Sequence, residues 1–170
     1  MAGSYRIISA RLLTRENFAE FGDVIDTGGG LHYPINGGMT ERFHALARPE
    51  AAGPGGHVLI NIFTGQPYRL PLTLCMVERH PLGSQAFMPL SPRPFLVVVC
   101  PDGEDGPGEP QAFVTAPGQG VNYPCNLWHG VLTVIGEPQD FLVVDRGGDG
   151  MNLEEHVFET PYEIRLPQGV

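Results

Sequence analysis

Glycine and proline recur at short intervals along the whole chain, and this spacing constrains the fold more than any other feature. Glycine (23 residues) and proline (17 residues) make up nearly a quarter of the 170 residues and separate short apolar runs. Turn residues spaced in this way are typical of many short strands and leave little room for long helices. The apolar runs need one shared core, so a single domain over residues 1–170 is expected.

The apolar runs predict an all-β fold. A strand is expected over Tyr5–Leu13, and Thr14 and Gly22 are the expected cap and end of a short helix. A short strand is expected over Asp23–Thr27, and the polar stretch Leu31–Leu46 is expected to form a loop. The further expected strands are His57–Thr64, Leu72–His80, Gln85–Pro89, Phe95–Cys100, Gln111–Thr115, Gly120–Tyr123, Trp128–Ile135 and Phe141–Asp145. Roughly eight to eleven strands with one or two short helices indicate a β-sandwich or barrel.

The charge balance argues against two classes of partner. The net charge is −9, and all ten basic residues are arginine. Nucleic acids and anionic membranes both require a positive footprint, so neither is expected as a partner. No apolar run approaches the roughly 20 residues that span a bilayer, and the N-terminus lacks the apolar core of a signal peptide. Three cysteines without a CxxC pair fit reduced thiols, so a cytoplasmic protein is expected.

The expected strand Leu72–His80 carries the most informative polar pattern. Side chains alternate between the two faces of a strand, which places Glu78 and His80 on one face and Arg79 on the other. The Cα atoms of Glu78 and His80 are then about 7 Å apart, close enough for the side chains to share a metal ion, a proton or a substrate. An exposed polar strand face without a function is the alternative interpretation.

A further histidine, His129, lies beside the only tryptophan at the start of another expected strand. The pattern resembles the two motifs of cupins, a His-x-His followed by a glutamate and a histidine that follows a proline-containing turn. Here the first motif reads Glu78-x-His80 followed by Gln85, and Pro124 precedes His129. The resemblance implies a cupin-like β-barrel or jelly roll in which these four polar residues meet and bind a divalent metal ion such as nickel, zinc or manganese. A polar barrel mouth without a metal is the alternative.

Four segments also resemble the ureidoglycolate lyase family: Ile35–Ala47, Leu70–Leu90, Gln119–Leu132 and Asp140–Gly148. The resemblance implies a homodimer that splits (S)-ureidoglycolate into glyoxylate and urea during allantoin degradation in purine catabolism. It also implies a divalent metal, nickel above all, and no organic cofactor.

The residues suit that chemistry. Ureidoglycolate is a carbinolamine, whose cleavage needs removal of the hydroxyl proton and protonation of the departing urea nitrogen. A general base and a general acid beside one carbon are sufficient. We expect His129 or Glu78 to be the base, and His80 to be the acid or a metal ligand.

The substrate is a small carboxylate, so it needs local donors on this acidic protein. Arginine forms a two-pronged contact with a carboxylate, and Arg42 is the first candidate, with His44 on the same face. This segment is a candidate cover for the barrel mouth, from its own subunit or from a partner. Arg146 is a second candidate for the carboxylate, with a local turn role as its alternative. Asn36 and Asn61 are candidates for the urea or hydroxyl group, since amides match urea's donors and acceptors.

Two other functions are compatible with the same residues. A non-catalytic cupin that binds a small molecule would carry the altered ligand set without a reaction. A ureidoglycolate amidohydrolase would use the same substrate but release ammonia instead of urea.

Overall fold

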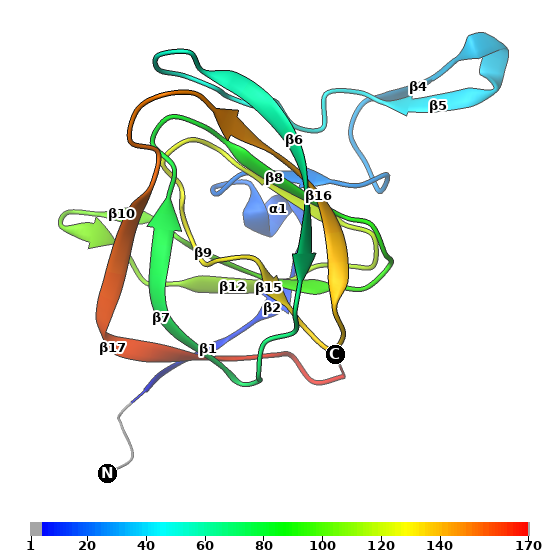
Figure 1. Ribbon diagram of the computed structural model, residues 1–170. Coiled ribbons are helices and arrows are strands. Elements are labelled where there is room, and N and C mark those ends of the chain that lie inside the picture. The colour runs from blue at the N-terminus through cyan, green and yellow to red at the C-terminus, as the bar shows by residue number, and fades with distance from the viewer. Residues whose placement is uncertain (1–4, 170) are drawn as a thin grey trace.

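The computed structural model describes residues 5–169, and β-strands dominate it (Figure 1). The elements in chain order are β1 (Arg6–Ser9), β2 (Arg11–Leu12), α1 (Arg15–Phe18), β3 (Asp23–Ile25), β4 (His32–Ile35), η1 (Asn36–Gly38), β5 (Thr40–Phe43), β6 (His57–Gly65), β7 (Leu72–Arg79), β8 (Gln85–Pro89), β9 (Phe95–Cys100), β10 (Asp102–Gly103), β11 (Gly106–Pro107), β12 (Gln111–Val114), β13 (Gly120–Tyr123), β14 (Trp128–His129), β15 (Thr133–Val134), β16 (Gln139–Gly147) and β17 (Glu154–Arg165). One sheet has the order β1-β17-β7-β14-β9-β12-β2, with β15 also paired to β9. The other sheet has the order β3-β13-β8-β16-β6.

The first sheet curls back on itself. Strand β1 pairs in parallel with β17 at one edge, and β2 pairs in parallel with β12 at the other. Because only Ala10 separates β1 from β2, the two edges meet and the sheet is nearly closed. This all-β, nearly closed architecture confirms the expected cupin-like barrel.

Strand β9 separates two hydrophobic cores, and all of its residues are buried. Its odd-numbered side chains join a core between the two sheets, which includes Phe95, Val97, Val99, Phe87, Phe113, Val121, Phe141 and Val143. Its even-numbered side chains join a second core inside the curled sheet, which includes Leu96, Val98, Cys100, Leu72, Leu74, Val114, Trp128, Tyr162 and Ile164. A strand buried on both faces must be apolar throughout, which explains the unbroken run at residues 95–100.

The expected strands agree with the structure where the apolar pattern is strong, and differ in three places. The opening strand is divided at Ala10, and the expected strand Trp128–Ile135 is divided into β14 and β15. The longest strand, β17, was missed because charged residues and Pro161 interrupt its apolar pattern. The structure describes seventeen strands in residues 5–169, more than expected, because several of them contain only two residues.

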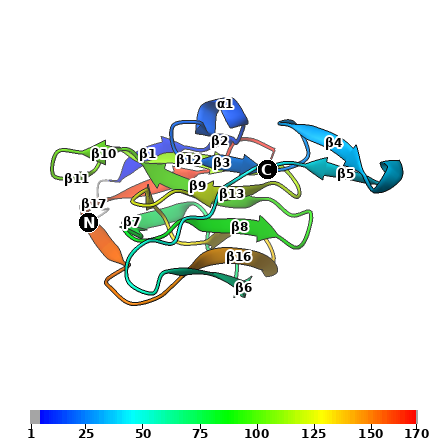
Figure 2. The same cartoon turned by 90° about the horizontal axis from the view of Figure 1, so that it is seen from above.

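The stretch expected to be a loop forms a hairpin instead. Strands β4 and β5 pair with each other around η1, and the hairpin projects from the body of the molecule in both views (Figures 1 and 2). The short helix α1 begins as expected, after Thr14. The Thr14 side chain accepts a hydrogen bond from the backbone amide of Asn17, and the Asn17 side chain accepts one from the backbone amide of Thr14. Within residues 5–169, no helix has the length and apolar character needed to cross a membrane.

Candidate active site and metal centre

Three of the expected site residues converge at one end of the barrel. The end of β7 supplies Glu78, His80 follows directly after it, and β14 supplies His129. His129 lies opposite Glu78 in the antiparallel pairing of β14 with β7. One ligand atom from each of the three side chains lies within 4.8 Å of the others, and we call this group the Glu–His–His cluster.

Backbone carbonyls fix the orientation of both imidazoles. His80 Nδ1 donates to the Asn152 carbonyl at 2.8 Å, and His129 Nδ1 donates to the Gly130 carbonyl at 3.0 Å. The Nε2 atoms of both rings are buried and have no hydrogen-bond partner among the described residues. Each ring therefore directs the lone pair of Nε2 toward the cluster, as in histidines that bind a metal ion. Two imidazole nitrogens and a carboxylate oxygen form a donor set that fits a divalent transition metal.

Burial shifts the protonation of His129 and Glu78 toward their uncharged forms. Burial lowers the pKa of His129 to about 4, although its bond to the Gly130 carbonyl opposes this shift. Burial also raises the pKa of Glu78, and the nearby His80 opposes this shift. The Tyr123 ring stacks on His129 with 4.5 Å between ring centroids, which helps to hold the imidazole in place. At neutral pH the imidazole of His129 is therefore neutral, the form that binds metals and accepts protons.

A second acidic residue, Asp145 on β16, lies beside the cluster and was not identified from the sequence. Asn61 on β6 donates to its carboxylate at 2.8 Å. Burial raises the pKa of Asp145, while His80, Asn61 and Gln85 each lower it. Strand alternation in the sequence could have indicated it, because Asp145 lies on the same face of β16 as the buried Phe141 and Val143.

Two predicted site residues, Gln85 and Asn61, are hydrogen-bonded to the Asp145 carboxylate. A small cavity of about 50 Å³ is bordered by His80, Ser84, Gln85, Asp145, Arg146 and Asn152. We call the Glu–His–His cluster together with Gln85 and Asp145 the barrel mouth. That Gln85 ligates a metal and that Asn61 contacts the substrate both remain predictions.

Neither arginine near the barrel mouth directs a free guanidinium into it. Arg146 is buried and donates to the carbonyls of Ala52 and Asp149, both at 2.6 Å, and of Gly148 at 3.2 Å. These bonds satisfy the guanidinium of Arg146 without a substrate; that Arg146 binds the substrate stays a prediction. Arg79 faces away as alternation predicted, since it pairs with Glu154 at 2.5 Å and lies over the Trp128 ring at 4.3 Å, outside the cluster.

The remaining predicted residues lie on the projecting hairpin. Arg42 is on β5, His44 follows it, and Asn36 is at the tip, where it donates to Thr40 at 3.3 Å. The structure does not bring these residues to the barrel mouth of their own chain. Arg42 and His44 do share a face, because Tyr33 lies opposite Arg42 and contacts His44.

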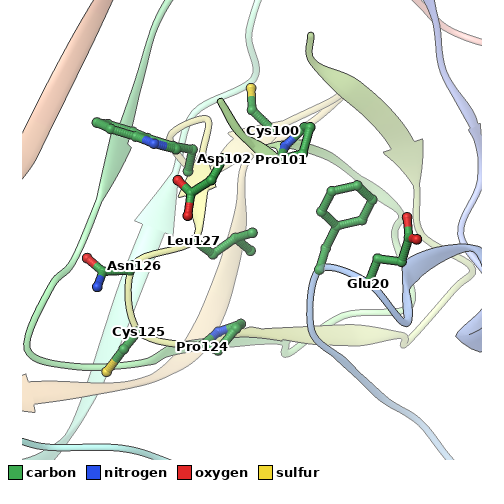
Figure 3. Close-up of a pocket in the computed structure, with 10 residues that line it drawn as sticks. Glu20, Cys100, Pro101, Asp102, Pro124, Cys125, Asn126 and Leu127 are labelled. Atoms are coloured by element: carbon green, nitrogen blue, oxygen red, sulfur yellow. The ribbon is translucent and has the colours of Figure 1, made fainter. Parts of the chain in front are cut away.

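A larger cavity, of about 390 Å³, lies elsewhere (Figure 3). Glu20 borders it from the segment after α1, and Asp102 borders it from β10. Both charged side chains that line it are acidic, which disfavours a carboxylate ligand. Burial raises the pKa of the Cys100 thiol to about 12 and of the Cys125 thiol to about 11, so neither is an activated nucleophile.

A β-barrel with one glutamate and two histidines converging at one end defines a protein of the cupin type. The chain belongs to the ureidoglycolate lyase family, because the model of that family matches residues 5–165. The chain is 72% identical to a ureidoglycolate lyase from Mesorhizobium japonicum over 94% of this chain and 98% of that protein. It is 63% identical to a ureidoglycolate lyase from Chelativorans sp. over 96% of this chain and 99% of that protein. It is 56% identical to ureidoglycolate lyase 2 from Rhizobium meliloti over 91% of this chain and 94% of that protein.

Proposed function

We propose that this protein is a lyase that splits (S)-ureidoglycolate into glyoxylate and urea, in the degradation of allantoin. The observation that carries the proposal is the pair of buried, unpartnered Nε2 atoms directed toward Glu78. The names of the relatives, at 56 to 72% identity, support the substrate. The reaction needs groups that move protons, and the Glu–His–His cluster supplies both a carboxylate and imidazoles.

The proposed reaction breaks one C–N bond and needs two proton transfers, one from the substrate hydroxyl and one to the urea nitrogen. His129 or Glu78 accepts the proton of the substrate hydroxyl, and the oxygen forms the carbonyl of glyoxylate as the C–N electron pair leaves. The urea nitrogen takes up a proton from the Nε2 atom of His80 in its imidazolium form, urea departs, and the proton held by the base returns to His80 before the next turnover. No covalent intermediate is required, because a carbinolamine collapses once both protons are handled.

As the alternative to this metal-free reaction, we propose that Glu78, His80 and His129 hold a divalent metal ion, with nickel as the first candidate and zinc or manganese as alternatives. Gln85 is the proposed fourth ligand. Such an ion, when bound, lowers the pKa of the substrate hydroxyl. The chain's own residues then orient the substrate and exclude water from the cluster. Metal analysis of protein purified without chelator, together with activity after chelation, tests this part of the proposal.

The activity is tested by following glyoxylate release from ureidoglycolate above the spontaneous rate. Glu78→Gln and His129→Asn are each expected to lower kcat by about 10²–10⁴-fold. The exposed Glu137, which pairs with Arg93, provides a control variant, Glu137→Gln, that should retain full activity. Near-normal kcat in both cluster variants would contradict the assignment. The absence of any excess over the spontaneous rate would favour a binding protein, and release of ammonium would favour an amidohydrolase.

We further propose that the protein is a cytoplasmic homodimer. Strand β6 is an edge strand of its sheet and exposes Val58, Ile60 and Ile62, with 72% of Ile60 and 57% of Ile62 accessible to solvent. Apolar side chains on an open strand edge are typical of a surface covered by a partner. Sedimentation equilibrium measures the oligomeric state directly.

A further inference from the structure

Within residues 5–169, the β4–β5 hairpin forms no strand pairing with the rest of the fold. Its strands pair only with each other, and the hydrogen bonds of described residues 32–44 all end within residues 31–44. Met39 near its tip is 87% exposed. A lone two-stranded hairpin is marginally stable in water, so this one needs a surface to pack against.

One face of the hairpin offers an arginine for binding. Tyr33 lies opposite Arg42, and its hydroxyl is 3.5 Å from Nδ1 of His44. Arg42 is exposed and forms no ion pair or side-chain hydrogen bond with any residue from 5 to 169. The face therefore presents an unengaged guanidinium beside two rings that can contact a small molecule.

Among residues 5–169, no unengaged guanidinium borders the barrel mouth to form a two-pronged contact with the substrate carboxylate. Its charged side chains include the carboxylates of Glu78 and Asp145. The guanidinium of Arg79 lies outside, and that of Arg146 is engaged by backbone carbonyls. The hairpin face thus offers the unengaged guanidinium that the mouth does not have, but the fold holds the hairpin apart from the mouth within one chain (Figure 1).

We propose that two copies of this chain exchange hairpins, so that Arg42 of each copy binds the substrate carboxylate at the barrel mouth of the other. This inference rests on the proposed function for the identity of the ligand. The exposed side chains of Val58, Ile60 and Ile62 on β6 provide the adjoining apolar contact. Each active site is then complete only in the dimer, and a two-fold axis generates both sites at once.

Single substitutions test the role of Arg42. Arg42→Ala is expected to lower kcat/KM by about 10- to 100-fold, mainly through KM, because a charge-assisted contact to the carboxylate is lost. Arg48→Ala is the matched control, since Arg48 is also exposed and lies just beyond the hairpin. Unchanged kcat/KM in Arg42→Ala would overturn the proposal.

Mixed dimers distinguish exchange from action within one chain. Arg42→Ala and Glu78→Gln chains with different tags are co-expressed, and dimers that contain one of each are purified. Under exchange, one of the two sites joins an intact cluster to an intact hairpin. The mixed dimer should therefore show about half of the wild-type kcat/KM. Mixed dimers no more active than either parent, or a monomeric wild-type chain, would overturn the exchange.

A crosslinking measurement separates this inference from the proposed function. A photoreactive amino acid at position 39 should form an adduct between subunits, whether or not the wild-type chain splits ureidoglycolate. Adducts without lyase activity would reject the proposed function and retain the exchange. Adducts confined to one subunit would reject the exchange alone.

Discussion

At the scale of single residues, the site depends on side chains whose orientation is set by partners distant in sequence. Asn152 illustrates this, because its carbonyl accepts from His80 while its side chain accepts from the amide of Leu82. Asn61 has the same role for Asp145, across 84 positions of sequence. Such partners fix ring and carboxylate positions at little entropic cost during the reaction.

Removing the donor of Asn61 should destabilise the protein. Asn61→Leu leaves the half-buried Asp145 carboxylate without its 2.8 Å hydrogen bond, and we expect a loss of about 1–3 kcal/mol in the free energy of unfolding. Urea denaturation provides the measurement. The double variant Asn61→Leu/Asp145→Leu should recover part of the loss, because no unpaired acceptor remains. Equal stability of wild type and Asn61→Leu would show that Asp145 does not need this partner.

Asp26 should make stability depend on pH. Burial raises its pKa, but hydrogen bonds from Gln119, Gly28 and Arg15 outweigh burial, so the pKa lies below its ordinary value of 3.8. A carboxyl group with a lowered pKa stabilises the folded state above the ordinary pKa, and this contribution is lost as the pH falls further. Asp26→Asn should therefore cost about 1–2 kcal/mol at neutral pH and progressively less in acid.

Denaturation curves of wild type and Asp26→Asn across the acid range measure this difference. The exposed Glu159, which forms no ion pair with another described residue, provides the control Glu159→Gln. A cost of Asp26→Asn that is the same at every pH would exclude the charge as its cause.

At the scale of elements, Gly22 is required for packing rather than for its turn. The sequence marked it as the end of the helix, but a Cβ atom at this position would lie 2.2 Å from the backbone oxygen of Asn122 on β13. Gly22→Ala must therefore separate the end of the α1 segment from β13. We expect a loss of about 1–3 kcal/mol, measured by urea denaturation. Gly118→Ala has open space around the added Cβ and is the steric control, although its positive φ adds strain of its own.

The sequence predicted those elements that have a regular pattern. The bounds of β8, β9 and β13 agree, and alternation separated Glu78 from Arg79 correctly. The alternation does not continue along the whole of β7. Leu74 and Val77 are both buried although they are three positions apart, and the register with β17 shifts at the same place. Irregular pairings of this kind depend on contacts between distant strands, which local patterns do not contain.

The candidate site was predictable only in part for the same reason. The strand period identified Glu78 and His80, and the spacing of the cupin motifs identified His129. Asp145 was missed because nothing near it in the sequence shows that Asn61 is its partner. The hairpin that carries Arg42 was expected to be a loop, because polar stretches without alternation resemble loops.

At the scale of the whole molecule, the proposed metal site links two distant parts of the chain. Glu78 lies near the end of β7, His80 directly follows that strand, and His129 is the last residue of β14, so a bound ion would join the two strands. A ligand that binds only the folded state stabilises it, by about 4 kcal/mol at a thousand times its Kd. Thermal denaturation with Ni²⁺ should thus show a higher Tm than with chelator.

The triple variant Glu78→Gln/His80→Asn/His129→Asn should show no such difference in Tm between Ni²⁺ and chelator. A rise in Tm that persists in the variant would locate the ion elsewhere. No rise in the wild type with Ni²⁺, Zn²⁺ or Mn²⁺ would argue against a metal at this cluster.

The position of β9 between two cores determines how the protein unfolds. Neither core can lose its packing without exposing one face of the same strand, so the two halves should unfold cooperatively rather than separately. Amide protons of β9 should accordingly exchange with solvent only through global unfolding, while those of the projecting hairpin in an isolated chain exchange through local opening.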